Sequence, residues 1–189
     1  MSIVRTRHRL SVADYGRMID FGILTENDRV ELIHGEIVEK MSIGEFHAGC
    51  VNRLTRFFTL KFGRRAVVAV QNPIRLADSE PEPDISILKP RDDDYAAGHP
   101  TPADVLLIVE VADASLDYDR DVKGPLYAAN GIAEYWILNL VDRTLEIRRQ
   151  PQGAGGYAEV RTLSGEDAAN VALLPDVSVK VSELFPPTA

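Results

Sequence analysis

The sequence predicts an α/β fold in which a central mixed β-sheet is flanked by helices. The first observation is the apolar run Val105–Val111, which is typical of a strand buried on both faces. The second is the segment Glu45–Phe62, whose apolar residues recur at helical spacing. The third is the order of the predicted elements, which runs helix, hairpin, helix, four strands, helix and further strands. The order of the strands within the sheet does not follow from these observations.

The N-terminal part of the chain predicts a helix followed by a β-hairpin. Ser11 is a suitable N-cap, and apolar residues follow it at helical spacing, so a helix is expected over residues 11–20. The segments Arg29–Ile33 and Glu36–Met41 have the alternating pattern of short strands. Gly35 lies between them and can adopt the positive φ that a tight hairpin turn requires.

The middle of the chain predicts a long helix and then four strands. Helix Glu45–Phe62 is followed by Gly63, and its apolar stripe comprises Val51, Leu54, Phe57, Phe58 and Phe62. The strands expected after it are Ala66–Val70, Pro73–Leu76, Ile85–Leu88 and Val105–Val111. We expect the first two to form a hairpin around Gln71-Asn72, and the proline-containing segment Lys89–Pro102 to be a loop.

The C-terminal part predicts one further helix and then several strands. The helix is expected over Asp119–Asn130, with Gly124-Pro125 delaying or kinking its start. Segments Tyr135–Leu140 and Thr144–Arg149 are expected to pair through a turn at residues 141–143. A glycine-rich turn at 152–156, short strands and a final turn at 183–185 complete the chain.

Composition restricts the class of protein. The chain has 189 residues, 45% of them hydrophobic, which suits one folded domain over residues 1–189. No apolar run approaches the roughly 20 residues of a membrane span, and no apolar stretch follows the N-terminal arginines as in a secretory signal. Cys50 is the one cysteine, which excludes an intrachain disulfide and fits a reducing cytoplasm.

The charged residues are segregated along the chain, whose net charge is −8. Residues 80–121 contain twelve acidic and three basic side chains, whereas residues 46–75 contain six basic side chains and no acidic one. An acidic, metal-binding centre beside a basic surface would suit a phosphodiester substrate. A solvated acidic loop next to an ordinary amphipathic helix explains the same pattern without any ligand.

Two acidic residues stand in positions that favour a divalent cation. Asp84 opens a predicted strand after Pro83, and Glu110 lies near the end of the buried strand. A carboxylate on an apolar strand is unfavourable to bury without compensation, and Mg²⁺ or Mn²⁺ would provide it. The backbone carbonyl of Val111 could add a third oxygen ligand. The alternative is that Glu110 forms a structural ion pair with a nearby Arg or Lys.

Lys123 is the third candidate, because its ammonium beside two carboxylates could hold a phosphate and offset developing negative charge. A surface lysine is the simpler interpretation. His47 could act as a base or phosphate contact, or as a capping or buried histidine. Glu31 could approach the metal, or be a hairpin surface charge. Nothing around Cys50 suggests a thiol nucleophile, and the sequence contains no phosphate-binding glycine motif.

Together with further short segments, these residues give the chain a resemblance to the bacterial Uma-two family of endonucleases within the PD-(D/E)XK restriction-endonuclease-like superfamily. The resemblance extends from Tyr15 to Phe185. The matching segments are Glu31-Leu32-Ile33-His34-Gly35-Glu36, His47, Pro83-Asp84-Ile85, Val109-Glu110-Val111, Asp121-Val122-Lys123 with Tyr127, Gly131-Ile132-Ala133-Glu134-Tyr135-Trp136-Ile137, Leu174-Pro175 and Glu183-Leu184-Phe185. Each segment is weak alone, and the set in this order is specific.

The resemblance implies a restriction-endonuclease-like core at about residues 29–150, with an N-terminal helix and hairpin. It implies that Asp84 and Glu110 are the motif acids and that Glu31 and His47 assist at the site. The superfamily places a lysine two residues after the glutamate, where this chain has Ala112. Many members of this branch supply it from the following helix, where Lys123 matches. The chain also departs from the family at residues 112–115, where a Ser-Pro-Ser type loop is common.

These observations lead to two functional hypotheses. The first is a Mg²⁺- or Mn²⁺-dependent endonuclease acting on DNA, with RNA or branched DNA as other possible substrates and a homodimer as a possible assembly. Its expected DNA-backbone contacts are Arg53, Arg56, Lys61, Arg64 and Arg65. The second is a catalytically inactive module of the same fold that binds nucleic acid or protein. The net negative charge and Ala112 favour the second hypothesis.

Overall fold

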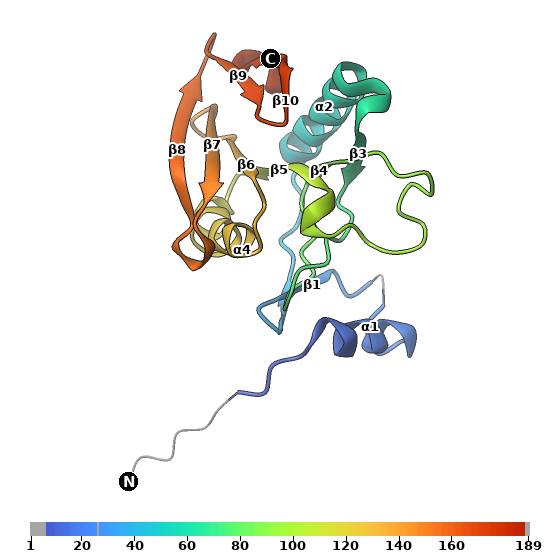
Figure 1. Cartoon of the computed structure of the whole chain (residues 1–189). Helices are drawn as coiled ribbons and strands as arrows, with labels where there is room; N and C mark the ends of the chain where they lie inside the picture. The colour runs from blue at the N-terminus through green and yellow to red at the C-terminus, as the bar shows by residue number, and fades with distance from the viewer. Residues whose placement is uncertain (1–6, 26, 188–189) are drawn as a thin grey trace.

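A computed structural model describes residues 7–25 and 27–187 of the chain, and Figure 1 shows how its elements are arranged. The helices are α1 (Val12–Asp20), α2 (Glu45–Phe62), α3 (Leu116–Tyr118), α4 (Gly124–Ala129) and α5 (Val181–Leu184), with a π-helical turn at Asp119–Lys123. The strands are β1 (Val30–Ile33), β2 (Glu36–Glu39), β3 (Val67–Val70), β4 (Ile85–Leu88), β5 (Val105–Ala112), β6 (Glu134–Asn139), β7 (Thr144–Pro151), β8 (Tyr157–Ser164), β9 (Ala168–Val171) and β10 (Leu174–Lys180).

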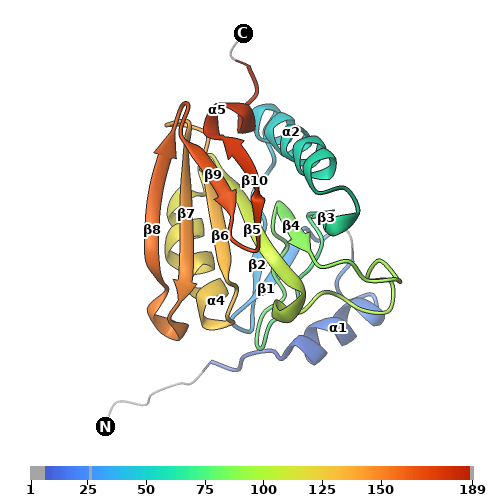
Figure 2. The ribbon, with the colours of Figure 1, turned by 45° about the horizontal axis from the view of Figure 1, so that its top comes forward.

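The central sheet has six strands in the order β3-β4-β5-β6-β7-β8, so the predicted α/β fold with a mixed sheet is confirmed. Strands β5 and β6 are parallel, while the other neighbouring pairs of this sheet are antiparallel. A parallel pair needs a crossover connection, and here α3, the π turn and α4 provide it. Two further strand pairs, β1-β2 and β9-β10, stand outside the central sheet (Figure 2).

The sheet separates two hydrophobic clusters, because successive side chains of each strand point to opposite faces. On one face, Trp136 packs with the apolar side of α2, with α5 and with β9 and β10. On the other face, Tyr135 and Ile137 pack against α4 and against Ile33 of the hairpin. All eight residues of β5 are buried, as the apolar run predicts. Glu110 belongs to the face that α4 covers, since its neighbours Val109 and Val111 belong to the α2 cluster.

The predicted N-terminal helix and hairpin are both present. Ser11 caps α1 through a reciprocal capping box with Asp14. The β1-β2 turn has His34 at φ 49° and Gly35 at φ 73°, in the left-handed region expected for such a turn. Leu32 also forms an isolated β-bridge with Glu80. This bridge connects the hairpin to the segment before β4 and thereby brings Glu31 toward the central sheet.

The predicted strand Pro73–Leu76 and its hairpin with Ala66–Val70 are wrong. Strand β3 pairs instead with β4, and Val70 lies opposite Ile85. Pro73 lacks an amide hydrogen, and the amides of Ile74 and Leu76 donate to the carbonyls of Pro81 and Ser79. The segment therefore folds back on its own continuation. Its two apolar side chains are buried all the same, which explains the strand-like pattern.

The predicted helix Asp119–Asn130 begins earlier than expected, at Leu116, and contains the π turn. Gly124 and Pro125 do not delay its start, since they lie at the junction of the π turn and α4. The segment between β4 and β5 is an exposed loop, as expected for Lys89–Pro102, and it projects from the body in Figure 1. Throughout the described residues, none of the helices combines the length and apolar character needed to cross a membrane.

Candidate active site

Asp84 and Glu110 lie opposite each other at the end of the β4-β5 pair. Ile85 pairs with Val109 in this antiparallel register, which places the preceding Asp84 across from Glu110. The Asp84 amide donates to Oε2 of Glu110 at 3.2 Å. The Val111 amide donates to Oδ2 of Asp84 at 2.9 Å. The two acids predicted from sequence are thus joined through the backbone of their own strands.

Asp84 is held by polar groups from two other segments. Its Oδ2 lies 3.1 Å from Nε2 of His47, near the start of α2, and its Oδ1 accepts from Nε2 of Gln71 at 3.3 Å. Burial alone would raise the pKa of Asp84, but the hydrogen bond and charge of His47, together with the Val111 amide and the charge of Lys123, reverse this, so the pKa is lowered. The same hydrogen bond raises the pKa of His47 despite its partial burial. The pair therefore favours an ionised carboxylate beside a charged imidazole.

Glu110 has a drier and more crowded environment. Its side chain is 4% exposed, and its Oε1 accepts from Nζ of Lys123 at 2.9 Å and from the hydroxyl of Tyr127 at 2.9 Å. Burial, with smaller contributions from Asp119 and Asp84, raises the pKa of Glu110 to about 8, although Lys123 opposes the rise. The sequence pattern places Lys123 and Tyr127 four residues apart on the crossover helix, so both side chains reach the same oxygen.

Lys123 is a buried ammonium surrounded by carboxylates. Its Nζ lies 3.8 Å from Oε1 of Glu31 as well as 2.9 Å from Glu110. Burial would lower its pKa, but the charges of Glu110, Glu31 and Asp119 outweigh that effect and raise it. Glu31 is fixed in turn by the Glu82 amide, which donates to Oε2 at 3.1 Å. Lys123 therefore stays charged and in place without any ligand.

The structure brings together every residue that the sequence singled out for the acidic centre. These are Asp84, Glu110, Val111, Lys123, Glu31 and His47. Two further groups were not predicted as site residues: Gln71, on Asp84, and the hydroxyl of Tyr127, on Glu110. The spacing of four residues after Lys123 could have indicated Tyr127, whereas no local sequence signal connects Gln71 with Asp84.

Two buried polar atoms near this centre have no hydrogen-bond partner among the described residues: Nδ1 of His47 and the hydroxyl of Tyr118. Within the same residues, no group of three or more His, Cys, Asp or Glu side chains converges as metal ligands. Mg²⁺ usually takes only one or two protein carboxylates and completes its shell with water and substrate. The carboxylate oxygens of Asp84 and Glu110 therefore suit a hard divalent cation. At Val111 the group that contacts Asp84 is the amide N–H, which is a donor and not a cation ligand.

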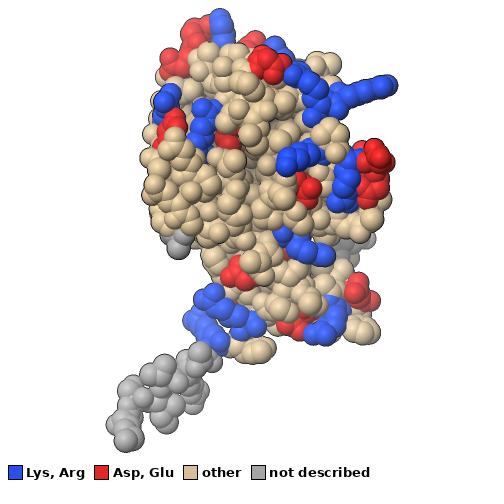
Figure 3. All heavy atoms as spheres, in the orientation of Figure 1, with Lys and Arg blue, Asp and Glu red and all other residues tan. Residues whose placement is uncertain are grey.

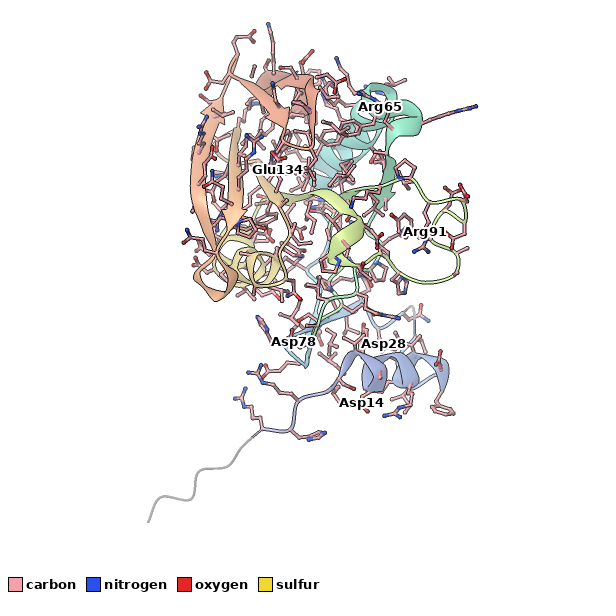
Figure 4. The ribbon with its side chains drawn as sticks, in the orientation of Figure 1. Asp14, Asp28, Arg65, Asp78, Arg91 and Glu134 are labelled. Atoms are coloured by element: carbon pink, nitrogen blue, oxygen red, sulfur yellow. The ribbon has the colours of Figure 1, made fainter. Side chains whose placement is uncertain are left out.

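Four of the predicted basic residues lie away from His47: Arg56 by its position around α2, Lys61 by its distance along the axis, and Arg64 and Arg65 because they follow the helix. At about 100° per residue, Arg56 is roughly half a turn around the helix from His47, which faces the sheet. Lys61 is about 21 Å further along the axis. Figure 3 shows basic side chains over the region of α2 and β3 with acidic ones among them, and Figure 4 places Arg65 beside that end of the helix. Arg65 pairs there with Asp176, and Arg53 donates to the carbonyl of Glu183.

The mixed sheet with its flanking helices is a fold shared with a protein of the nuclease class. A solved structure titled as a putative nuclease belonging to DUF820 from Anabaena variabilis matches with a TM-score of 0.68 and 16% identity, over 87% of this chain and 94% of that one. The family model "Uma2: Putative restriction endonuclease" matches residues 12–182, and the chain belongs to this family. A search of curated proteins gave no match. Family membership supports a nuclease.

Proposed function

We propose that this protein is a metal-dependent endonuclease that hydrolyses phosphodiester bonds in DNA. The observation that carries the proposal is the pairing of two acids, Asp84 and Glu110, with a buried lysine 2.9 Å from one of them. Folding a lysine and three carboxylates into one buried cluster is unfavourable unless their charges are used or well compensated. Phosphodiester hydrolysis uses both signs of charge, since acids hold a cation and a lysine faces the phosphate.

The residues would divide this chemistry between them. Asp84, Glu110 and the Val111 carbonyl would hold Mg²⁺ or Mn²⁺, which supplies Lewis acid stabilisation and an acidified water when bound. Lys123 would face the scissile phosphate and offset the charge that develops on its oxygens. Glu31 keeps that ammonium oriented from the hairpin side, and His47 keeps Asp84 ionised and oriented from α2. Arg53, Arg56, Lys61, Arg64 and Arg65 would contact the DNA backbone.

The experiment is nicking of supercoiled plasmid by the wild type, Asp84→Asn, Glu110→Gln and Lys123→Met, each with Mg²⁺, Mn²⁺ and EDTA. We expect metal-dependent nicking that falls more than about 100-fold in each variant, because each loses a group that acts in the transition state. Glu134→Gln is the matched control. Glu134 is a fully buried carboxylate of β6 paired with Arg149 rather than with the site (labelled in Figure 4). Full nicking by the Asp84 and Glu110 variants would contradict the proposal.

A second candidate is an inactive module that binds nucleic acid or protein. The observation that favours it is that both carboxylates already accept hydrogen bonds from the protein, through His47, Gln71 and Val111 on one side and Lys123 and Tyr127 on the other. Calorimetric titration of Mn²⁺ into the wild type and Glu110→Gln separates the two. Binding that the variant loses supports the nuclease. A wild type that neither binds Mn²⁺ nor cleaves DNA, RNA or branched DNA supports the module.

A further inference from the structure

The π-helical turn Asp119–Lys123 is an unusual element in the crossover between β5 and β6. The Gly124 amide donates to the Asp119 carbonyl, which is the pairing five residues apart that defines a π turn. Single π turns inside α-helices are rare, and they occur frequently at functional sites. Here the turn ends at Lys123, whose ammonium reaches Glu110 and Glu31. The position of that ammonium therefore depends on this turn.

Pro125 removes a hydrogen-bond donor from the π turn. In the π pairing, the Arg120 carbonyl would accept from residue 125, which has no amide hydrogen because it is proline. A carbonyl without a helical partner needs a donor from elsewhere when it lies inside the protein. Nη1 of Arg148, on β7, donates to the Arg120 carbonyl at 3.0 Å. A side chain from a distant strand thus replaces the hydrogen bond that Pro125 removes.

Arg148 is held firmly for this task. Its Nε donates to Oε1 of Glu146 at 2.5 Å, and Glu146 is 8% exposed. The second oxygen of Glu146 accepts from Nε of Arg120 at 3.0 Å, so the carboxylate connects the strand with the turn. Gly124 leaves the room that the guanidinium needs, because a Cβ there would lie 2.8 Å from Nη1 of Arg148. The contact between Arg148 and the turn therefore depends on Gly124, which leaves room for the guanidinium, and on Pro125, which leaves the carbonyl without a helical donor.

We propose that Arg148 is a positioning residue of the site: by capping the Arg120 carbonyl it maintains the π turn and so holds Lys123 against Glu110. Arg148 itself bonds to Glu146 and to the Arg120 carbonyl, and to neither Asp84 nor Glu110. The effect of Arg148 on catalysis rests on the proposed nuclease function.

The test replaces Arg148 by lysine. A single ammonium can keep the charge beside Glu146, but it lacks the planar fork that serves Glu146 and the Arg120 carbonyl together. For Arg148→Lys we expect kcat for plasmid nicking to fall at least 10-fold while KM changes less than twofold. We also expect reductive methylation of Lys123, followed by mass spectrometry, to accelerate at least 10-fold. Arg149→Lys is the matched control, since Arg149 pairs with Glu134 and not with the turn.

A rescue variant separates positioning from general stability. Pro125→Ala restores an amide at residue 125, so the double variant Pro125→Ala, Arg148→Lys should return kcat and Lys123 methylation to within about threefold of the wild type. Unchanged methylation in Arg148→Lys, or no rescue by Pro125→Ala, would overturn the proposal. The methylation rate does not depend on turnover. A wild type without nuclease activity would therefore refute the proposed function while the role of Arg148 is still decided.

Discussion

Asp84 and Glu110 differ in their surroundings although they face each other across two strands. Asp84 accepts hydrogen bonds from His47 and Gln71. Burial raises its pKa, but His47, the Val111 amide and the charge of Lys123 together outweigh burial, so the pKa is lowered. Glu110 is enclosed, and burial raises its pKa to about 8. Environments that push the pKa values of two neighbouring acids apart are typical of sites where each acid has a different role.

The protonation of Glu110 makes stability depend on pH in the metal-free protein. Its pKa rises from 4.5 to about 8 on folding, so the folded chain keeps a proton that the unfolded chain releases between these values. The free energy of unfolding should therefore fall by at least about 1 kcal/mol between pH 5 and pH 8. Urea denaturation in EDTA at several pH values measures this, and Glu110→Gln should have a flatter profile than the wild type.

Two other groups titrate in part of the same range and must be separated from Glu110. Burial raises the pKa of Asp119 to about 6, which gives a loss of stability as pH rises from 3.8 to about 6. The raised pKa of His47 acts in the same direction near and above pH 6.5. Both groups are kept in Glu110→Gln, so the difference between its profile and that of the wild type isolates Glu110. The same dependence of unfolding free energy on pH in the wild type and Glu110→Gln would contradict a raised pKa of Glu110.

At the level of single residues, the sequence predicts the acids of the candidate site but not the side chains that hold them. Asp84 and Glu110 are recognisable because a carboxylate beside or within an apolar strand is unusual. Gln71 reaches Asp84 only because β3 pairs with β4, whereas the sequence pattern predicts that β3 pairs with the segment after Pro73. A long-range contact of this kind depends on strand pairing, which one sequence does not determine.

Among the elements, the β1-β2 hairpin is fixed by a close backbone approach. The Gly35 carbonyl accepts from the Leu10 amide at 2.9 Å, and a Cβ on Gly35 would lie 2.8 Å from the Leu10 carbonyl oxygen. The φ of 73° adds to the penalty for any side chain. Gly35 is therefore required by the segment that leads into α1 as well as by the hairpin turn.

Gly35→Ala tests this approach. We expect it to destabilise the protein by more than about 2 kcal/mol, the sum of strain at positive φ and a backbone clash. Gly131→Ala is the control, because Gly131 has φ +76° but a Cβ there would meet nothing within 4 Å. It should lose only about 1–2 kcal/mol. Equal losses in chemical denaturation would show that the Leu10 contact has no effect.

The helices and most strands could be predicted because their own residues specify them. Apolar spacing and a terminal glycine indicate α2, and a run that is apolar except for Glu110 indicates β5. The π turn could not be predicted, since the group that donates to its Arg120 carbonyl, Arg148, is on a strand that follows later in the chain. A local sequence pattern does not predict an element whose hydrogen bonds are completed by a side chain from a distant part of the chain.

Over the whole molecule, Arg56 and the acidic centre lie on opposite sides of α2. Arg56 is exposed on the outer side of the helix, while His47 turns inward to Asp84. A DNA backbone bound along Arg56 would therefore pass the N-terminal end of α2 to reach the acids. The predicted contacts with the DNA backbone can therefore be tested separately from the chemistry of the acidic site.

Arg56→Ala tests whether this surface binds DNA. If Arg56 neutralises one phosphate, the slope of log K against log salt concentration should become less steep by about 1, with little dependence on DNA sequence. Fluorescence anisotropy with a labelled duplex at several salt concentrations measures the slope. Arg161→Ala, which removes an exposed arginine of β8, should leave it unchanged. The same slope in wild type and Arg56→Ala would exclude Arg56 as a phosphate contact.

The exposed loop between β4 and β5 divides the candidate site between two halves of the chain. Glu31, His47 and Asp84 precede this loop, whereas Glu110 and Lys123 follow it. A single proteolytic nick there would yield two fragments, each carrying an incomplete set of these groups. The β4-β5 pairing and the packing of α2 against β5 and α5 would be the contacts that reunite them. Expressed as separate pieces fused to two other proteins, the halves would form a split reporter whose signal appears only when those proteins meet.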